Sequence, residues 1–146
     1  MVEKFTPRRI LVPVNGATSD EDALRFAFRL ALRQRGKVFA VAVVEVPRGL
    51  PLSNVQGEVV TAAEKVLQRA EEVGREYEVE TRVEVLQARE AAPAIVEEAT
   101  ALSADLVVVG LSFRERFGEF YLGRTVPYIL RHAPCRVMLL REEPPG

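Results

Sequence analysis

Two glycines frame the stretch GLSFRERFGEFYLGRT, which runs from Gly110 to Thr125. It follows an apolar run and precedes a helical pattern, the place where parallel α/β proteins hold phosphate groups on backbone amides. Arg124, directly after Gly123, adds a guanidinium that can meet phosphate oxygens. Phe113, however, is bulky where a phosphate loop favours small residues. The stretch therefore predicts a nucleotide loop whose interior has been modified.

Other reactive side chains lack the partners that chemistry would need. The single histidine, His132, and the single cysteine, Cys135, lie near each other in the sequence, but no further His or Cys completes a metal or nucleophile site. Ser112 lacks the flanking glycines of a nucleophile elbow. The acidic residues 20–22 cluster at a predicted helix start, where the helix dipole accounts for them. We predict no catalytic residue, no metal site and no enzymatic activity.

Composition indicates one ordinary globular domain. The chain has 146 residues, of which 48% are hydrophobic and 28% charged. We expect a single domain over 1–146, with a core over about 8–141 and a frayed tail at 142–146. A net charge of −1 gives no general attraction to nucleic acid. With no long apolar segment and one cysteine, the sequence predicts no membrane insertion and a cytoplasmic location.

Strand-like and helix-like segments alternate along the chain. The pattern predicts a first helix with Ser19 as its N-cap and Gly36 at its end. Strands separated by helices predict a doubly wound parallel sheet, with helices on both faces and the ligand crevice at the carboxyl ends of the strands. The remaining segments are strands at 9–14, 38–46, 78–87, 106–110 and 136–141, and helices at 60–74, 91–102 and 125–132.

Three segments resemble the universal stress protein family. They are ILVPVNGATSDEDALRFA (Ile10 to Ala27), ADLVVVG (Ala104 to Gly110) and LRHAPCRVMLLR (Leu130 to Arg141). The resemblance implies a Rossmann-like, five-stranded sheet in the order 3-2-1-4-5, of the adenine nucleotide alpha hydrolase-like fold. It also implies a homodimer formed along the fifth strand, Arg136 to Arg141. An exposed edge reading VMLL is a natural pairing surface, although the C-terminal tail could cap it instead.

ATP-binding members of that family carry a motif of glycine, two residues, glycine, nine residues, glycine and then Ser or Thr. In this chain Gly110 and Gly123 match, whereas Phe113 and Arg124 replace the second glycine and the Ser or Thr. Asn15 stands where the family has an acidic residue. A combined loss of ~3 kcal/mol would weaken affinity about a hundredfold, so weak or absent ATP binding is expected. The candidate site, for ATP or AMP if either binds, comprises Val14, Asn15, Val43, Val109, Gly110, Gly123, Arg124 and Thr125.

Four aromatic residues of the loop, Phe113, Phe117, Phe120 and Tyr121, follow helical spacing. They predict a short amphipathic helix with three open roles. It could fill the crevice with rings, dock a protein partner, or pack on its own domain.

Three functions remain at this stage. The first is a non-enzymatic stress-response or regulatory protein that acts through dimerisation and protein contacts. The second is an ATP or AMP sensor in which Arg124 replaces lost contacts. The third is a regulatory module of an amino-acid transporter, because VVEVPRGLPL (Val43 to Leu52) resembles a stretch of stress-type domains appended to such transporters.

Overall fold

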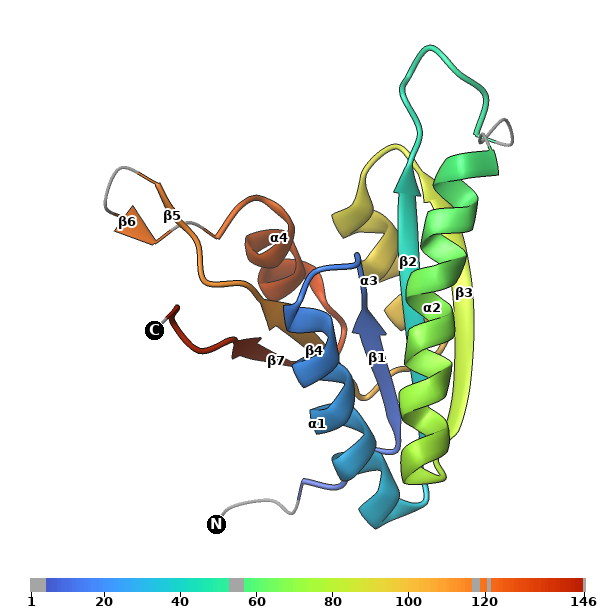
Figure 1. Ribbon diagram of the computed structural model, residues 1–146, viewed down its shortest axis with the longest axis vertical. Coiled ribbons are helices and arrows are strands. Elements are labelled where there is room, and N and C mark those ends of the chain that lie inside the picture. Colours follow the sequence, from blue (N-terminus) through green and yellow to red (C-terminus); the bar gives the residue numbers. More distant parts are fainter. Residues whose placement is uncertain (1–4, 53–56, 117–118, 121, 146) are drawn as a thin grey trace.

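A parallel sheet of five strands forms the centre of the computed structural model, which describes residues 5–52, 57–116, 119–120 and 122–145 (Figure 1). The strand order is β3-β2-β1-β4-β7, which confirms the predicted order 3-2-1-4-5. The most apolar strands occupy the middle of the sheet. Helices cover both faces there, so side chains on both faces of these strands are buried. The strands are β1 (Arg9–Pro13), β2 (Lys37–Glu45), β3 (Glu80–Ala88), β4 (Leu106–Leu111) and β7 (Arg136–Arg141).

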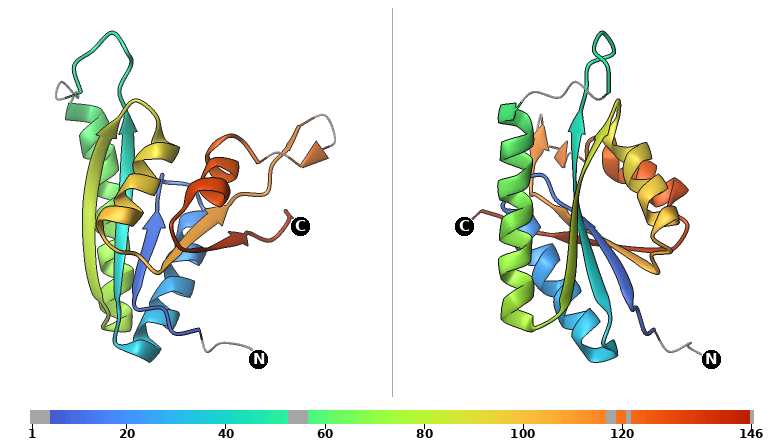
Figure 2. Two further views of the ribbon diagram at one scale, coloured as in Figure 1. Left: turned by 180° about the vertical axis from the view of Figure 1, so that it is seen from behind. Right: turned by 90° about the vertical axis from the view of Figure 1, so that its right-hand side faces the viewer.

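Helices cover both faces of the sheet. Figure 2 shows α1 (Ser19–Gln34) and α2 (Gly57–Tyr77) on one side, and α3 (Ala91–Ala101) and α4 (Thr125–His132) on the other. Each pair encloses its own apolar core, centred on Phe28 beneath α1 and α2 and on Ile95 and Ile129 beneath α3 and α4. Among the helices in the described ranges, none is long and apolar enough to cross a bilayer.

The ends of α1 differ from the prediction. Ser19 is not the N-cap but the first helical residue, and it is only 2% exposed; Thr18 is the N-cap, without a side-chain capping bond. At the other end Arg35, rather than Gly36, adopts the left-handed conformation (φ 53°). Gly36 is needed for space, because a Cβ there would lie 2.5 Å from the carbonyl oxygen of Arg8.

The predicted amphipathic helix in the loop after β4 is wrong. Two short antiparallel strands stand there instead, β5 (Glu115–Arg116) and β6 (Glu119–Phe120). They lie outside the two helical layers (Figure 1). The overlooked signal is Gly118, the second of two residues that separate these strands in the sequence, because glycine in a two-residue connection favours a hairpin.

Candidate functional site

The two central strands separate before their carboxyl ends. β1 pairs with β4 at Ile10 and Leu11, whereas its pairing with β2 continues through Pro13. The amide of Val14 donates to the carbonyl of Val41 on β2 (2.9 Å), so the alternation of a parallel strand directs the nitrogen of Pro13 toward β4. Proline has no N–H to donate, and the β1–β4 ladder therefore stops.

A cavity of about 200 Å³ lies in this opening. The sheet, the start of α1 and the start of α4 meet around it, as expected for a crevice where strand order reverses. Its volume is below the roughly 300 Å³ at the lower end of small-molecule sites. The structure brings together at this cavity all eight residues predicted from the sequence, namely Val14, Asn15, Val43, Val109, Gly110, Gly123, Arg124 and Thr125.

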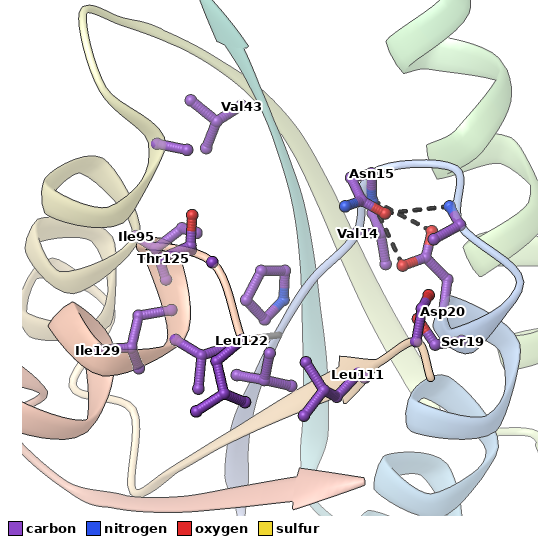
Figure 3. A pocket seen from close by; sticks show the side chains of 18 of the residues that line it. Val14, Asn15, Ser19, Asp20, Val43, Ile95, Leu111, Leu122, Thr125 and Ile129 are labelled. Atoms are coloured by element: carbon purple, nitrogen blue, oxygen red, sulfur yellow. Dashed lines mark hydrogen bonds between the residues drawn. The ribbon is translucent and has the colours of Figure 1, made fainter. Parts of the chain in front are cut away.

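The cavity has two chemically different walls, which Figure 3 shows facing each other. One is apolar and comes from β2, α3, α4 and the residue before Gly123. The other is polar and comes from the connection between β1 and α1 and from the first turn of α1. The apolar wall contains Val43, Ile95, Leu122 and Ile129, and the polar wall contains Asn15, Ser19 and Asp20.

The β1–α1 loop is held by its own side chains. Asp20 accepts hydrogen bonds from the amides of Gly16 (2.7 Å) and Asn15 (3.1 Å), and the side-chain oxygen of Asn15 accepts one from the amide of Ala17 (3.0 Å). Burial raises the pKa of Asp20, and the two amides partly offset this rise. Because the oxygen of Asn15 is engaged in the loop, its nitrogen is the group turned toward the cavity (Figure 3). Asn15 thus turns a hydrogen-bond donor toward a ligand, while its oxygen keeps one lone pair beyond the bond from Ala17.

The two framing glycines are required for different reasons. Gly110 permits close packing of β4 against α1, because a Cβ there would lie 2.4 Å from the carbonyl oxygen of Ser19. Gly123 supplies a left-handed backbone (φ 75°) immediately before α4. The spacing of this pair therefore reflects chain packing and a turn as much as it reflects a ligand.

Phe113 does not fill the cavity, contrary to one of the sequence-based interpretations. It is absent from the lining residues, and the guanidinium of Arg141 lies 5.1 Å from the centre of its ring. Its φ is not positive, so a phenylalanine in this place causes no left-handed backbone strain. The preceding residue, Ser112, does line the cavity, and its hydroxyl lies 3.2 Å from that of Ser19.

The C-terminal segment begins with an ordered residue, although the sequence predicted a frayed tail from 142. The amide of Glu142 donates to the carbonyl of Leu111 (2.8 Å). Its carboxylate accepts hydrogen bonds from the hydroxyl of Thr18 (2.8 Å) and from the amide of Phe113 (3.2 Å). These bonds join the end of β7 to the N-cap of α1 and to the loop after β4, both of which border the cavity.

Several lining residues escaped the sequence analysis. Asp20 was interpreted only as a helix-dipole residue, and Ser112 only as a failed nucleophile. Their proximity to Asn15 and Gly110 in the sequence was an available signal, whereas Ile95 and Leu122 carried none beyond being apolar. Phe117 and Tyr121 lie outside the described residues, and Phe120 is described only as backbone, so the proposed aromatic contact surface stays a prediction.

The other predicted exclusions concern His132 and Cys135. His132 packs against Tyr128, with ring centres 4.3 Å apart. Cys135 is half-buried, and burial raises the pKa of its thiol. Within the described part of the chain, no group of three or more His, Cys, Asp or Glu side chains is placed to hold a metal ion.

The sequence of this chain is similar to that of a known protein family. The profile of the universal stress protein family matches residues 6–141. A universal stress protein of Methanocaldococcus jannaschii is 25% identical over 143 residues, which cover 92% of this chain and 82% of the relative.

Solved structures with the same fold include two nucleotide complexes. The universal stress protein of Archaeoglobus fulgidus in complex with dAMP has a TM-score of 0.72 at 22% identity, covering 92% of this chain and 98% of the other. A universal stress protein family member of Arabidopsis thaliana with AMP bound has a TM-score of 0.66 at 18% identity, covering 94% and 93%. At these identities the likeness shows a shared fold.

Proposed function

Because the chain belongs to the universal stress protein family, we propose that it is a non-enzymatic regulatory protein that binds adenine mononucleotides weakly. The cavity at the separation of β1 and β4 carries this proposal, since all eight predicted residues line it. The nucleotides seen in the Archaeoglobus and Arabidopsis proteins support the same ligand class.

The two walls suit the two halves of a mononucleotide. A planar base would bury its faces against Val43, Ile95 and Ile129, where apolar contact supplies most of the affinity. The sugar and phosphate would face the hydroxyls and amides of the opposite wall and the start of α4. Arg124, exposed at the N-cap of α4, could pair with the phosphate.

Three observations support weak binding. The cavity is small, so a ligand must displace surrounding side chains. Asn15 has one lone pair of its oxygen engaged in the loop and carries no charge, so it is a weaker acceptor for a sugar hydroxyl than a carboxylate would be. Pro127 removes one amide from the first turn of α4. We expect a dissociation constant of about 0.1–1 mM for AMP, equivalent to roughly 4–5.5 kcal/mol of binding free energy.

The non-enzymatic part of the proposal rests on Asp20. It is the one carboxylate among the described residues that line the cavity, and it accepts hydrogen bonds from the Asn15 and Gly16 amides. A carboxylate committed to holding its own loop is poorly placed to remove a proton from water or substrate. We therefore expect no turnover of ATP.

Calorimetry with AMP and ATP tests this function. Arg124→Ala should weaken AMP binding by about threefold to tenfold, since one charge-assisted contact is removed. Arg131→Ala is the matched control, because Arg131 is also exposed on α4 but does not line the cavity. Absence of binding heat at ~10 mM of either nucleotide, far above the expected dissociation constant, would contradict the proposal.

We further propose that the protein acts as a homodimer paired along β7, which lies at the edge of the sheet. The amide of Glu142 points to β4, so by alternation the amide of Leu139 points outward and that of Leu140 points inward. Leu139→Pro should therefore remove a dimer hydrogen bond while sparing the β4–β7 ladder. Sedimentation should show a folded monomer; a variant that stays dimeric would refute pairing along β7. Leu140→Pro, which removes an internal bond, should instead destabilise the fold.

A further inference from the structure

Glu142 joins three parts of the chain that are distant in sequence. Its backbone extends the β7 side of the sheet through the bond to Leu111. Its half-buried side chain connects the N-cap of α1, through Thr18, to the loop after β4, through the amide of Phe113. A carboxylate is the natural group for this place, because the N-terminus of α1 carries a partial positive charge.

This connection lies directly behind the polar wall of the cavity. Thr18 stands between two lining residues, Ala17 and Ser19, and Phe113 stands between two others, Ser112 and Arg114. Inside the wall the same two segments are joined by the contact between the hydroxyls of Ser19 and Ser112. The carboxylate therefore fixes the distance between these two segments from the outer side.

We propose that Glu142 determines how many phosphate groups the cavity accepts, selecting a mononucleotide over ATP. This inference rests on the proposed function. It assigns to Glu142 a positioning and selecting role without direct contact with the ligand.

Two physical effects produce the selection. First, the amide of Phe113 has one proton, and Glu142 already accepts it, so this amide cannot donate to an extended phosphate chain. Second, the carboxylate places a negative charge behind the wall and repels each additional phosphate. Across a partly solvated wall, such repulsion amounts to about twofold to threefold in affinity per phosphate group, and salt reduces it.

Calorimetry on Glu142→Gln, with adenosine, AMP and ATP as ligands, tests the selection. The variant should bind ATP about tenfold more tightly and AMP about threefold more tightly, with adenosine unchanged within about twofold. High ionic strength should diminish the differences. Glu143→Gln is the matched control. It removes the same charge one residue later, where the exposed Glu143 forms no hydrogen bond or ion pair with the described part of the chain, and it should change binding by less than about twofold.

Three results would overturn the inference. They are an unchanged ratio of ATP to AMP affinity in Glu142→Gln, an equal gain for adenosine, or the same gain in Glu143→Gln. If no variant binds any adenine nucleotide, the proposed function fails and the selecting role fails with it.

A second measurement needs no ligand and separates the two failures. Hydrogen exchange at the amide of Phe113 should accelerate by at least about tenfold in Glu142→Ala and in Thr18→Val, but not in Glu143→Ala. Unchanged exchange in both variants would show that Glu142 does not hold the loop, whatever the nucleotide results. Circular dichroism confirms that each variant is folded before either measurement is interpreted.

Discussion

Two loops border the same cavity and are held in opposite ways. The loop between β1 and α1 is fixed mainly by the adjoining first turn of α1, where Asp20 accepts from amides four and five residues earlier, although Thr18 also donates to Glu142. The loop after β4 is fixed from outside, by Glu142 at the end of the last strand, 29 residues beyond Phe113. A loop that holds itself forms its conformation with few partners, whereas the second loop depends on the position of β7. The first is therefore the constant side of the site, and the second the adjustable one.

The largest effect on stability is expected at Gly110, where the end of β4 packs against the start of α1. Gly110→Ala should lower the free energy of unfolding by about 2–3 kcal/mol, because its Cβ would meet backbone atoms of Ser19 that cannot rotate away. Both loops should become more accessible to hydrogen exchange together. Urea unfolding measures the loss, with Gly49→Ala as the control, since no heavy atom lies within 4 Å of that position. Equal stability of the two variants would show that β4 and α1 are not in fixed contact.

The next effect should separate the loops. Asp20→Ala should cost about 1–2 kcal/mol, because the amides of Asn15 and Gly16 lose a charged acceptor. Exchange should accelerate at Gly16 and stay unchanged at Phe113. Asp22→Ala is the control, since Asp22 lies in the same helical turn and is exposed. Faster exchange at Phe113 in the Asp20 variant would contradict the independence of the two loops.

A third change should alter stability without affecting either loop. Burial raises the pKa of Glu98 on α3 to about 7. A hydrogen bond with Glu84 and repulsion by its charge contribute to the rise. The folded state therefore holds a proton that the unfolded state releases near pH 4.5, so stability falls as pH rises from about 4.5 to 7. Discounted for partial solvent exposure, Glu98→Gln should gain about 1 kcal/mol at about pH 8 and almost nothing at about pH 4.

Thermal unfolding across this pH range measures the gain from Glu98→Gln. Glu97→Gln serves as the control, because Glu97 is the exposed neighbour on the same helix. A gain in the Glu98 variant that is the same at every pH would indicate altered packing rather than titration.

The smallest effect concerns the bond between Glu142 and the N-cap of α1. Thr18→Val should cost about 0.5 kcal/mol, because the hydroxyl bond to Glu142 is partly solvated and Thr18 makes no side-chain capping bond. Urea unfolding with Thr61→Val, an exposed threonine of α2, as the control measures the difference. If Thr18→Val lowered the free energy of unfolding as much as Asp20→Ala does, the two loops would not differ in how they are held.

The same contrast explains what the sequence could predict. Apolar runs and turn residues indicated a parallel sheet with its crevice at the carboxyl ends of the strands. The strand order and most of the eight lining residues came from the resemblance to the universal stress protein family. Asn15 and Asp20 are close in sequence, and their bonding could have been anticipated from loop chemistry. The bond from Phe113 to Glu142 could not, because it depends on β7 completing the sheet. For the same reason one of the three interpretations of the loop aromatics placed Phe113 in the cavity, whereas it packs beside Arg141.

The central claim is that the separation of β1 and β4 is an adenine mononucleotide site. Titration of the isotope-labelled protein with AMP, followed by amide NMR, tests it most directly. We predict saturable shifts at Asn15, Gly110 and Thr125, with a dissociation constant of about 0.1–1 mM. Shifts confined to the opposite end of the sheet, around Arg8 and Arg35, or no shifts at ~10 mM AMP, would contradict it.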